Sequence, residues 1–164
     1  MRRTSQASIG VVLLFVLILS GCTQGPRELS MGEEECAHCR MMLSESAYAS
    51  QVVMNRGRSF PFDSIECMVA FWVTHIEPES IHSVWVPDFR NEDVWLDATT
   101  AVYLQSETMR SPMGLSLSAY DSEESARLQM EESGGRLLSW EELQELVAVE
   151  WELISEGQTG NQYE

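Results

Sequence analysis

The chain has 164 residues, of which 44% are apolar, and this is enough to bury one ordinary hydrophobic core. All ten basic residues are arginines, and 26 acidic residues bring the net charge to −16. This acidic excess argues against nucleic acid as the partner, because no basic patch is available to neutralise phosphates.

The first 22 residues are typical of a bacterial lipoprotein precursor. Arg2 and Arg3 form a positive segment, and the apolar run 9–19 is shorter than the about 20 residues that span a bilayer. The run leads into Leu-Ser-Gly-Cys, which resembles a lipobox. We therefore expect residues 1–21 to be removed as a signal peptide and Cys22 to carry the lipid. The residue after it is not the Asp that often retains lipoproteins in the inner membrane, which favours the outer membrane, facing the periplasm.

Two polar segments flank the predicted domain. Residues 22–35 are short and contain Gly25-Pro26, so we expect a tether between the lipid and the domain. Residues 153–164 are predicted as a polar tail, since 157–164 lack apolar periodicity. Outside the cytoplasm, the thiols of the domain are oxidised unless they are protected or bound to metal.

The domain itself reads as a repeated unit. Residues 62–66 and 120–124 share an aromatic residue, Asp-Ser, and a Glu three positions after the Asp, which predicts helices with Asp63 and Asp121 as N-caps. Each helix has strand-like segments around it, at 48–54, 59–62 and 83–87 in the first half and at 101–104, 115–120 and 136–138 in the second.

The order ββαβ therefore occurs twice. We expect an α+β fold of two similar ββαβ units packed as lobes, the first over residues 36–98 and the second over residues 99–152. An amphipathic helix that opens with a capping box at Ser139 closes the second unit.

A group of sulfur-containing side chains indicates metal binding. Cys36 and Cys39 form a Cys-x-x-Cys pair, and Met41 and Met42 follow. Thiolate and thioether are soft ligands, which favour Cu(I), and zinc is disfavoured because no second Cys-x-x-Cys completes a set of four. Cys39 and Met41 share a face only on an extended segment, so this stretch is predicted as strand or loop, with Met42 turned toward the core.

Other candidate ligands lie farther along the chain or within the motif. Met113 stands in the turn sequence Ser-Pro-Met-Gly, where a large apolar side chain has little structural reason to be, although core packing stays open for it. Met109 is an alternative sulfur, and His38 could add a nitrogen. Cys67 is interpreted as a small buried residue in the first turn of a helix. We find no phosphate loop, hydrolase triad or acid–base pair, so an enzyme is not expected.

Further short motifs follow the lipobox and the Cys-x-Met of Cys39 and Met41 in a fixed order. They are Phe62-Asp63, Cys67-Met68, Trp95-Leu96-Asp97-Ala98, Ser111-Pro112-Met113-Gly114, Ala119-Tyr120, and Gly134-Gly135 before Leu137-Leu138. Together they resemble the NosL family, the accessory lipoproteins of nitrous oxide reductase. The resemblance covers roughly residues 33–147.

The resemblance implies a Cu(I) chaperone that faces the periplasm and consists of two ββαβ units. It also implies that copper is supplied to nitrous oxide reductase, together with a membrane transporter complex. Carried over residue by residue, it implies Cys39, Met41 and Met113 as copper ligands. The role of Cys36 stays open: it binds a second Cu(I), protects Cys39 as a disulfide, or does little.

Two other function classes compete with a chaperone. The first is an extracytoplasmic thiol–disulfide oxidoreductase that uses Cys36 and Cys39, although such motifs usually open a helix after a strand. The second is an envelope binding module with a structural metal.

Overall fold

The computed structural model describes residues 25–75 and 78–153, so Cys22, its signal peptide and residues 154–164 of the predicted tail lie outside the described residues. No helix within the described ranges is long and apolar enough to cross a bilayer. The elements in chain order are β1 (Ser50–Met54), β2 (Ser59–Phe62), α2 (Ile65–His75), η1 (Pro78–Ser80), β3 (Ile81–Asp88), β4 (Asn91–Asp97), β5 (Val102–Gln105), β6 (Leu117–Tyr120), α3 (Glu123–Ser133), β7 (Arg136–Leu138) and α4 (Trp140–Glu150).

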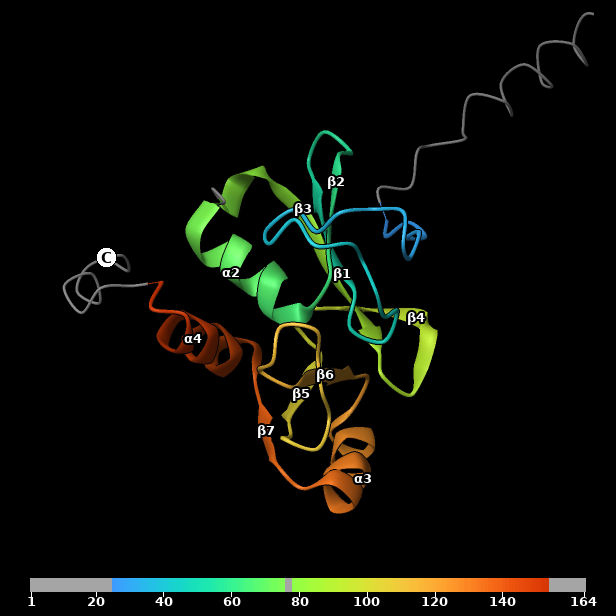
Figure 1. Ribbon diagram of the computed structural model, residues 1–164, viewed down its shortest axis with the longest axis vertical. Helices are drawn as coiled ribbons and strands as arrows, with labels where there is room; N and C mark the ends of the chain where they lie inside the picture. Colours follow the sequence, from blue (N-terminus) through green and yellow to red (C-terminus); the bar gives the residue numbers. More distant parts are fainter. Residues whose placement is uncertain (1–24, 76–77, 154–164) are drawn as a thin grey trace, which may run out of the picture.

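The two halves of the chain have the same topology, which confirms the α+β class and the repeated ββαβ order. The first sheet has the strand order β2-β1-β3-β4, and the second has the order β6-β5-β7, with every pairing antiparallel. In each unit the first strand is central, the second lies on one side of it, and the strand after the helix lies on the other. The two sheets lie one below the other in Figure 1, with α2 and α4 side by side near their junction.

Strand β4 is an element that was not predicted from the sequence. It extends the first sheet beyond β3, as an outer strand whose first four residues are exposed. Its acidic residues Glu92, Asp93 and Asp97 are all exposed. A strand with so few buried positions lacks the apolar alternation by which strands are recognised.

Serine, not aspartate, caps the repeated helices, so the prediction of Asp63 and Asp121 as N-caps is wrong. The Ser122 side chain accepts a hydrogen bond from the Ser125 N–H, and Ser64 accepts one from the Cys67 N–H at 3.2 Å. This leaves Asp63 available to accept hydrogen bonds from the backbone and hydroxyl of Ser44. The capping box of α4 is confirmed, with Ser139 and Glu142 in reciprocal contact.

The two units pack against each other through one main core cluster, beside a smaller cluster around Leu104 and Tyr120. Trp140 of α4 contacts Trp72 of α2 edge-on, with ring centroids 5.6 Å apart, and lies 6.2 Å from the Tyr103 ring of β5. The main cluster of buried apolar residues draws members from both units, including Cys36 and Cys67. The loops and helix ends at the junction are therefore held in fixed relative positions.

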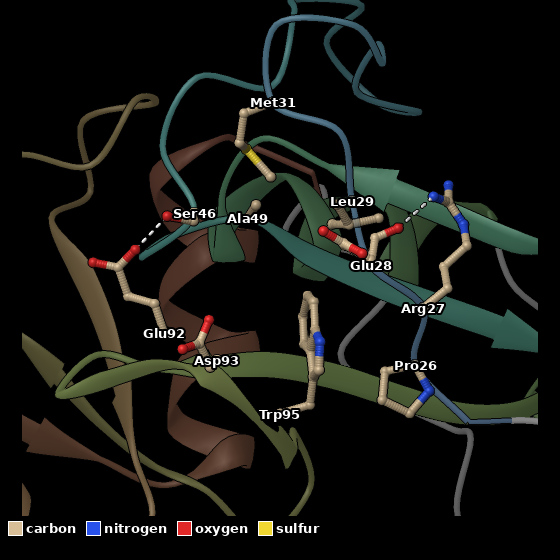
Figure 2. A pocket seen from close by; sticks show the side chains of 10 residues that line it. All are labelled: Pro26, Arg27, Glu28, Leu29, Met31, Ser46, Ala49, Glu92, Asp93 and Trp95. Carbon is tan, nitrogen blue, oxygen red and sulfur yellow. Dashed lines mark hydrogen bonds between the residues drawn. The ribbon is translucent and has the colours of Figure 1, made fainter.

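Residues 25–35 pack onto the domain, although their sequence predicts a tether. Leu29 is buried, and the Arg27 backbone exchanges hydrogen bonds with the Gln51 side chain. Arg27 also pairs with Glu34, which folds the segment back on itself. A hollow of about 480 Å³ lies between this segment and β4. Figure 2 shows Trp95 on its β4 side. The segment thus belongs to the folded part of the chain.

Candidate metal centre

The Cys-x-x-Cys motif lies in a tight loop. The Cys36 N–H donates to the Met41 carbonyl at 2.8 Å, and the Arg40 N–H donates to the Cys36 carbonyl at 3.1 Å. Arg40 adopts a left-handed backbone with φ of 66°, which reverses the chain before Met41. The loop prediction for this stretch is confirmed, and the motif does not open a helix.

The prediction that Met42 turns toward the core is wrong. Its side chain is 44% exposed, whereas the next residue, Leu43, is fully buried. The Leu43 N–H donates to the Glu34 carbonyl, and Met42 pairs with Glu35 in an isolated β-bridge. Met41 and Met42 are thus both exposed, so the simple alternation of an extended segment does not hold across this stretch.

Three thiols meet beneath this loop. The sulfur atoms of Cys36, Cys39 and Cys67 all lie within 4.8 Å of one another, and none of these cysteines forms a disulfide. Cys36 and Cys67 have no exposed surface, whereas Cys39 is partly exposed. Cys67 comes from the first turn of α2, so the interpretation of it as a merely structural residue missed its place in the cluster. An ion here would reach solvent on the Cys39 side.

Hydrogen bonds favour a thiolate at Cys36. The Cys36 sulfur accepts a hydrogen bond from the Cys67 thiol, which has the largest effect, and others from the backbone amides of Asp63, Cys39 and His38. Together they lower the pKa of Cys36 to about 5, although burial opposes this change. The Asp63 amide stands just before α2, where unpaired N–H groups stabilise negative charge. Among the three thiols, these contacts favour Cys36 as the charged soft ligand.

The other two thiols are held in the protonated form. The hydrogen bond to Cys36 and burial raise the pKa of Cys67 well above its usual range. Burial is the largest cause of the raised pKa of Cys39. A soft cation that binds the cluster displaces these protons, because the thiolate is the form that ligates metal.

The candidate methionines have different surroundings. Met41 is 51% exposed, next to the thiol of Cys39, which accepts a hydrogen bond from the Met41 backbone. Met113 is partly buried in its turn and packs against the main core. Met109 is only 8% exposed, and it belongs to a separate core cluster with Leu104 and Tyr120. Met109 is therefore a packing residue, not an alternative sulfur ligand.

The loop of Met113 is attached to the helix that carries Cys67. The Glu66 carboxylate accepts hydrogen bonds from the Ser111 hydroxyl and, at 3.0 Å, from the Leu115 N–H. Glu66 has no exposed surface, and burial raises its pKa. These contacts join the second unit to α2 one residue before the thiol cluster. No distance from Met113 to the cysteines follows from them, so its role as a ligand stays a prediction.

An open hollow of about 540 Å³ lies beside the loop. It is lined in part by His38 and Arg40 of the loop and by Arg58, whose guanidinium stands 4.4 Å above the Phe60 ring centroid. The His38 ring also stacks on Trp151, with centroids 5.8 Å apart. The loop is thus exposed on one side and supported by the end of α4 on the other.

Comparison with known proteins agrees with this fold. The crystal structure of the copper chaperone NosL from Shewanella denitrificans matches with a TM-score of 0.64, over 73% of this chain and 96% of that chain. The two sequences are 17% identical, so the likeness establishes the fold alone. A search of curated proteins finds no significant match. The family model of NosL matches residues 28–148, from the packed N-terminal segment to α4, and the chain therefore belongs to the NosL family.

Proposed function

We propose that this protein is a membrane-anchored Cu(I) metallochaperone of the bacterial envelope. It carries copper on the periplasmic side and delivers it for assembly of the copper centres of nitrous oxide reductase, together with the membrane transporter complex of that pathway. Copper is its cargo, and the protein performs no catalytic turnover. Family membership and the copper chaperone of the same fold support this proposal.

The position of Cys39 carries the argument. Its thiol is partly exposed, while Cys36 and Cys67 lie buried within 4.8 Å of it and Met41 lies exposed two residues later. Thiolates and thioethers select Cu(I) over harder ions. Copper held through Cys39, Met41 and Met113, with Cys36 in support, remains open to attack by a recipient's ligand.

We place the docking of a recipient at the hollow beside the loop, which Glu35 lines together with Arg40 and Arg58. Its Arg40 and Arg58 side chains are exposed, in a chain whose net charge is −16. Neither arginine takes part in an ion pair within the described residues. A partner with acidic groups at its docking surface is attracted to this side of the loop.

Anaerobic titration with Cu(I) followed by transfer tests the function. We expect saturable Cu(I) binding, and we expect the loaded protein to restore the copper spectrum of copper-free nitrous oxide reductase. A structural metal would instead stay bound during incubation with the reductase and with a Cu(I) chelator. Failure to bind Cu(I) at all would exclude a copper chaperone.

A thiol–disulfide oxidoreductase is the second candidate function, because the pKa of Cys36 beside Cys39 is low. A thiol of low pKa is the attacking group in such enzymes. Reduction of a disulfide substrate by the copper-free protein, lost in Cys36→Ser, would favour that function. We expect no reduction above that of the variant, because a Cys67 thiol blocks the Cys36 sulfur and both are buried.

The membrane anchor gives a separate prediction. Cys22→Ser removes the only proposed site of lipidation, so we expect the precursor to carry no acyl chains and to be absent from the detergent-extracted envelope. Mass spectrometry of the purified protein measures the lipid directly. Thr23→Ser serves as the control and keeps the lipid. Acyl chains on Cys22→Ser would contradict the lipoprotein assignment.

A further inference from the structure

Glu66 is a buried carboxylate that is not among the proposed copper ligands. It lies in the first turn of α2 with no exposed surface, and its Oε2 atom has no hydrogen-bond partner among the described residues. Burying a carboxylate is costly, and a well-packed apolar side chain at such a place is often as stable or more stable. Packing alone therefore does not account for Glu66, and its role follows from the groups that its carboxylate binds.

The groups that Glu66 holds are the two ends of the Met113 turn. Its Oε1 atom accepts the Ser111 hydroxyl, two residues before Met113, and the Leu115 N–H, two residues after it. The turn is also closed on itself, since the Gly114 N–H donates to the Ser111 carbonyl at 3.2 Å and the Ser116 N–H donates to the Ser111 hydroxyl at 2.9 Å. A single carboxylate oxygen thus fixes the turn on both sides of its methionine.

The same side chain also fixes the turn relative to the thiols. Glu66 precedes Cys67, whose sulfur lies within 4.8 Å of the Cys36 and Cys39 sulfurs. The Met113 turn belongs to the second unit, whereas α2 and the cysteine loop belong to the first. Without this contact, the turn would depend on packing alone to keep its position relative to α2.

We infer that Glu66 is a positioning residue for copper binding, which holds the Met113 thioether at the cysteine site by fixing both ends of its turn. This inference rests on the proposed function, since it assigns Met113 to the copper site. Residues that orient metal ligands typically change metal affinity by 10–100-fold when they are replaced.

The test is a double-mutant cycle on Cu(I) affinity, measured anaerobically by competition with a chromogenic chelator. We expect Glu66→Ala to weaken binding by about tenfold, as much as Met113→Leu, and the double variant to be no weaker than either one. Glu66→Gln should restore affinity, because its Oε1 atom accepts the same two hydrogen bonds. X-ray absorption of the copper-loaded Glu66→Ala protein should show one sulfur ligand fewer than the wild type.

A matched structural control separates positioning from general destabilisation. Tyr103→Phe removes the buried hydrogen bond from the Tyr103 hydroxyl to the Ala98 carbonyl, 2.6 Å long, and should lower thermal stability with unchanged Cu(I) affinity. Ser111→Ala removes one of the two Glu66 contacts and provides a milder variant if Glu66→Ala does not fold. Ser111→Ala should lower Cu(I) affinity in the otherwise wild-type protein, and it should not lower it further in the Met113→Leu variant.

Two results would overturn the inference. Additive losses in the double variant would show that Glu66 acts independently of Met113. An unchanged Cu(I) affinity in Met113→Leu would show that there is no ligand for Glu66 to position, while copper binding by the cysteines would still stand. The absence of Cu(I) binding in the wild-type protein would instead reject the proposed function itself.

Discussion

Cys39→Ser is expected to cause the largest loss of Cu(I) affinity of any single substitution. Cys39 is common to the buried thiol cluster and to the Cys39, Met41 and Met113 set, and it is the partly exposed member of the cluster. Loss of a thiolate ligand should weaken binding on the order of a hundredfold, about 2.8 kcal/mol. Anaerobic competition with a Cu(I) chelator measures this change.

Three other substitutions calibrate that result. Cys67→Ser should be milder, because a serine hydroxyl can still donate to the Cys36 sulfur. Met41→Leu should also be milder, since a thioether is neutral and another ligand can replace it. Met109→Leu is the matched methionine control and should leave affinity unchanged, because Met109 packs in a separate cluster. An affinity in Cys39→Ser equal to that of the Met109 control would remove the cysteine loop from the copper site.

Cu(I) is expected to increase protection from hydrogen exchange at two places that are distant in the sequence. A single ion that contacts Cys39 and Met113 binds only the arrangement in which the loop at 36–42 and the turn at 111–115 are both in place. Binding to that arrangement alone raises stability by about 2.7 kcal/mol when the free ion is at a hundred times its Kd. Anaerobic exchange with and without Cu(I), read by mass spectrometry, reports each segment separately.

The distribution of protection decides between two kinds of site. Protection at both segments supports a site between the two units, whereas protection confined to residues 36–42 would leave a local cysteine site without Met113. Met113→Leu is the matched control, and in this variant the turn at 111–115 should lose its copper-dependent protection. Uniform protection over the whole chain would indicate global stabilisation and would not support the bridging arrangement.

The repeated topology could be predicted because its signals are local. Helix starts and apolar residues at regular spacing lie within short windows, so both ββαβ units and the α4 capping box are predictable, although Ser and not the predicted Asp caps the two repeated helices. Strand β4 was missed because its sequence, Asn-Glu-Asp-Val-Trp-Leu-Asp, is mostly exposed and polar. The docking of residues 25–35 was missed because it depends on side chains elsewhere, such as Gln51.

The candidate site could be predicted only in part, for a related reason. Cys36, Cys39 and Met41 stand close together in the sequence, and their chemistry is visible there. Cys67 joins them only because α2 begins beneath the loop, which no spacing rule indicates. One available signal was the number of thiols, since three remain after Cys22 is assigned to the lipid and a paired set cannot account for three.

The outer strands of the first sheet have a consequence for self-association. Unpaired strand edges invite pairing with another copy, the first step toward aggregates. At β4, two approaching copies would bring the exposed Glu92 and Asp93 carboxylates together, and their repulsion opposes such pairing. At β2, Pro61 has no N–H to offer and its carbonyl accepts the Ala37 N–H of the cysteine loop. The loop that gathers the thiols thus also covers part of an edge at which another copy of the protein could pair.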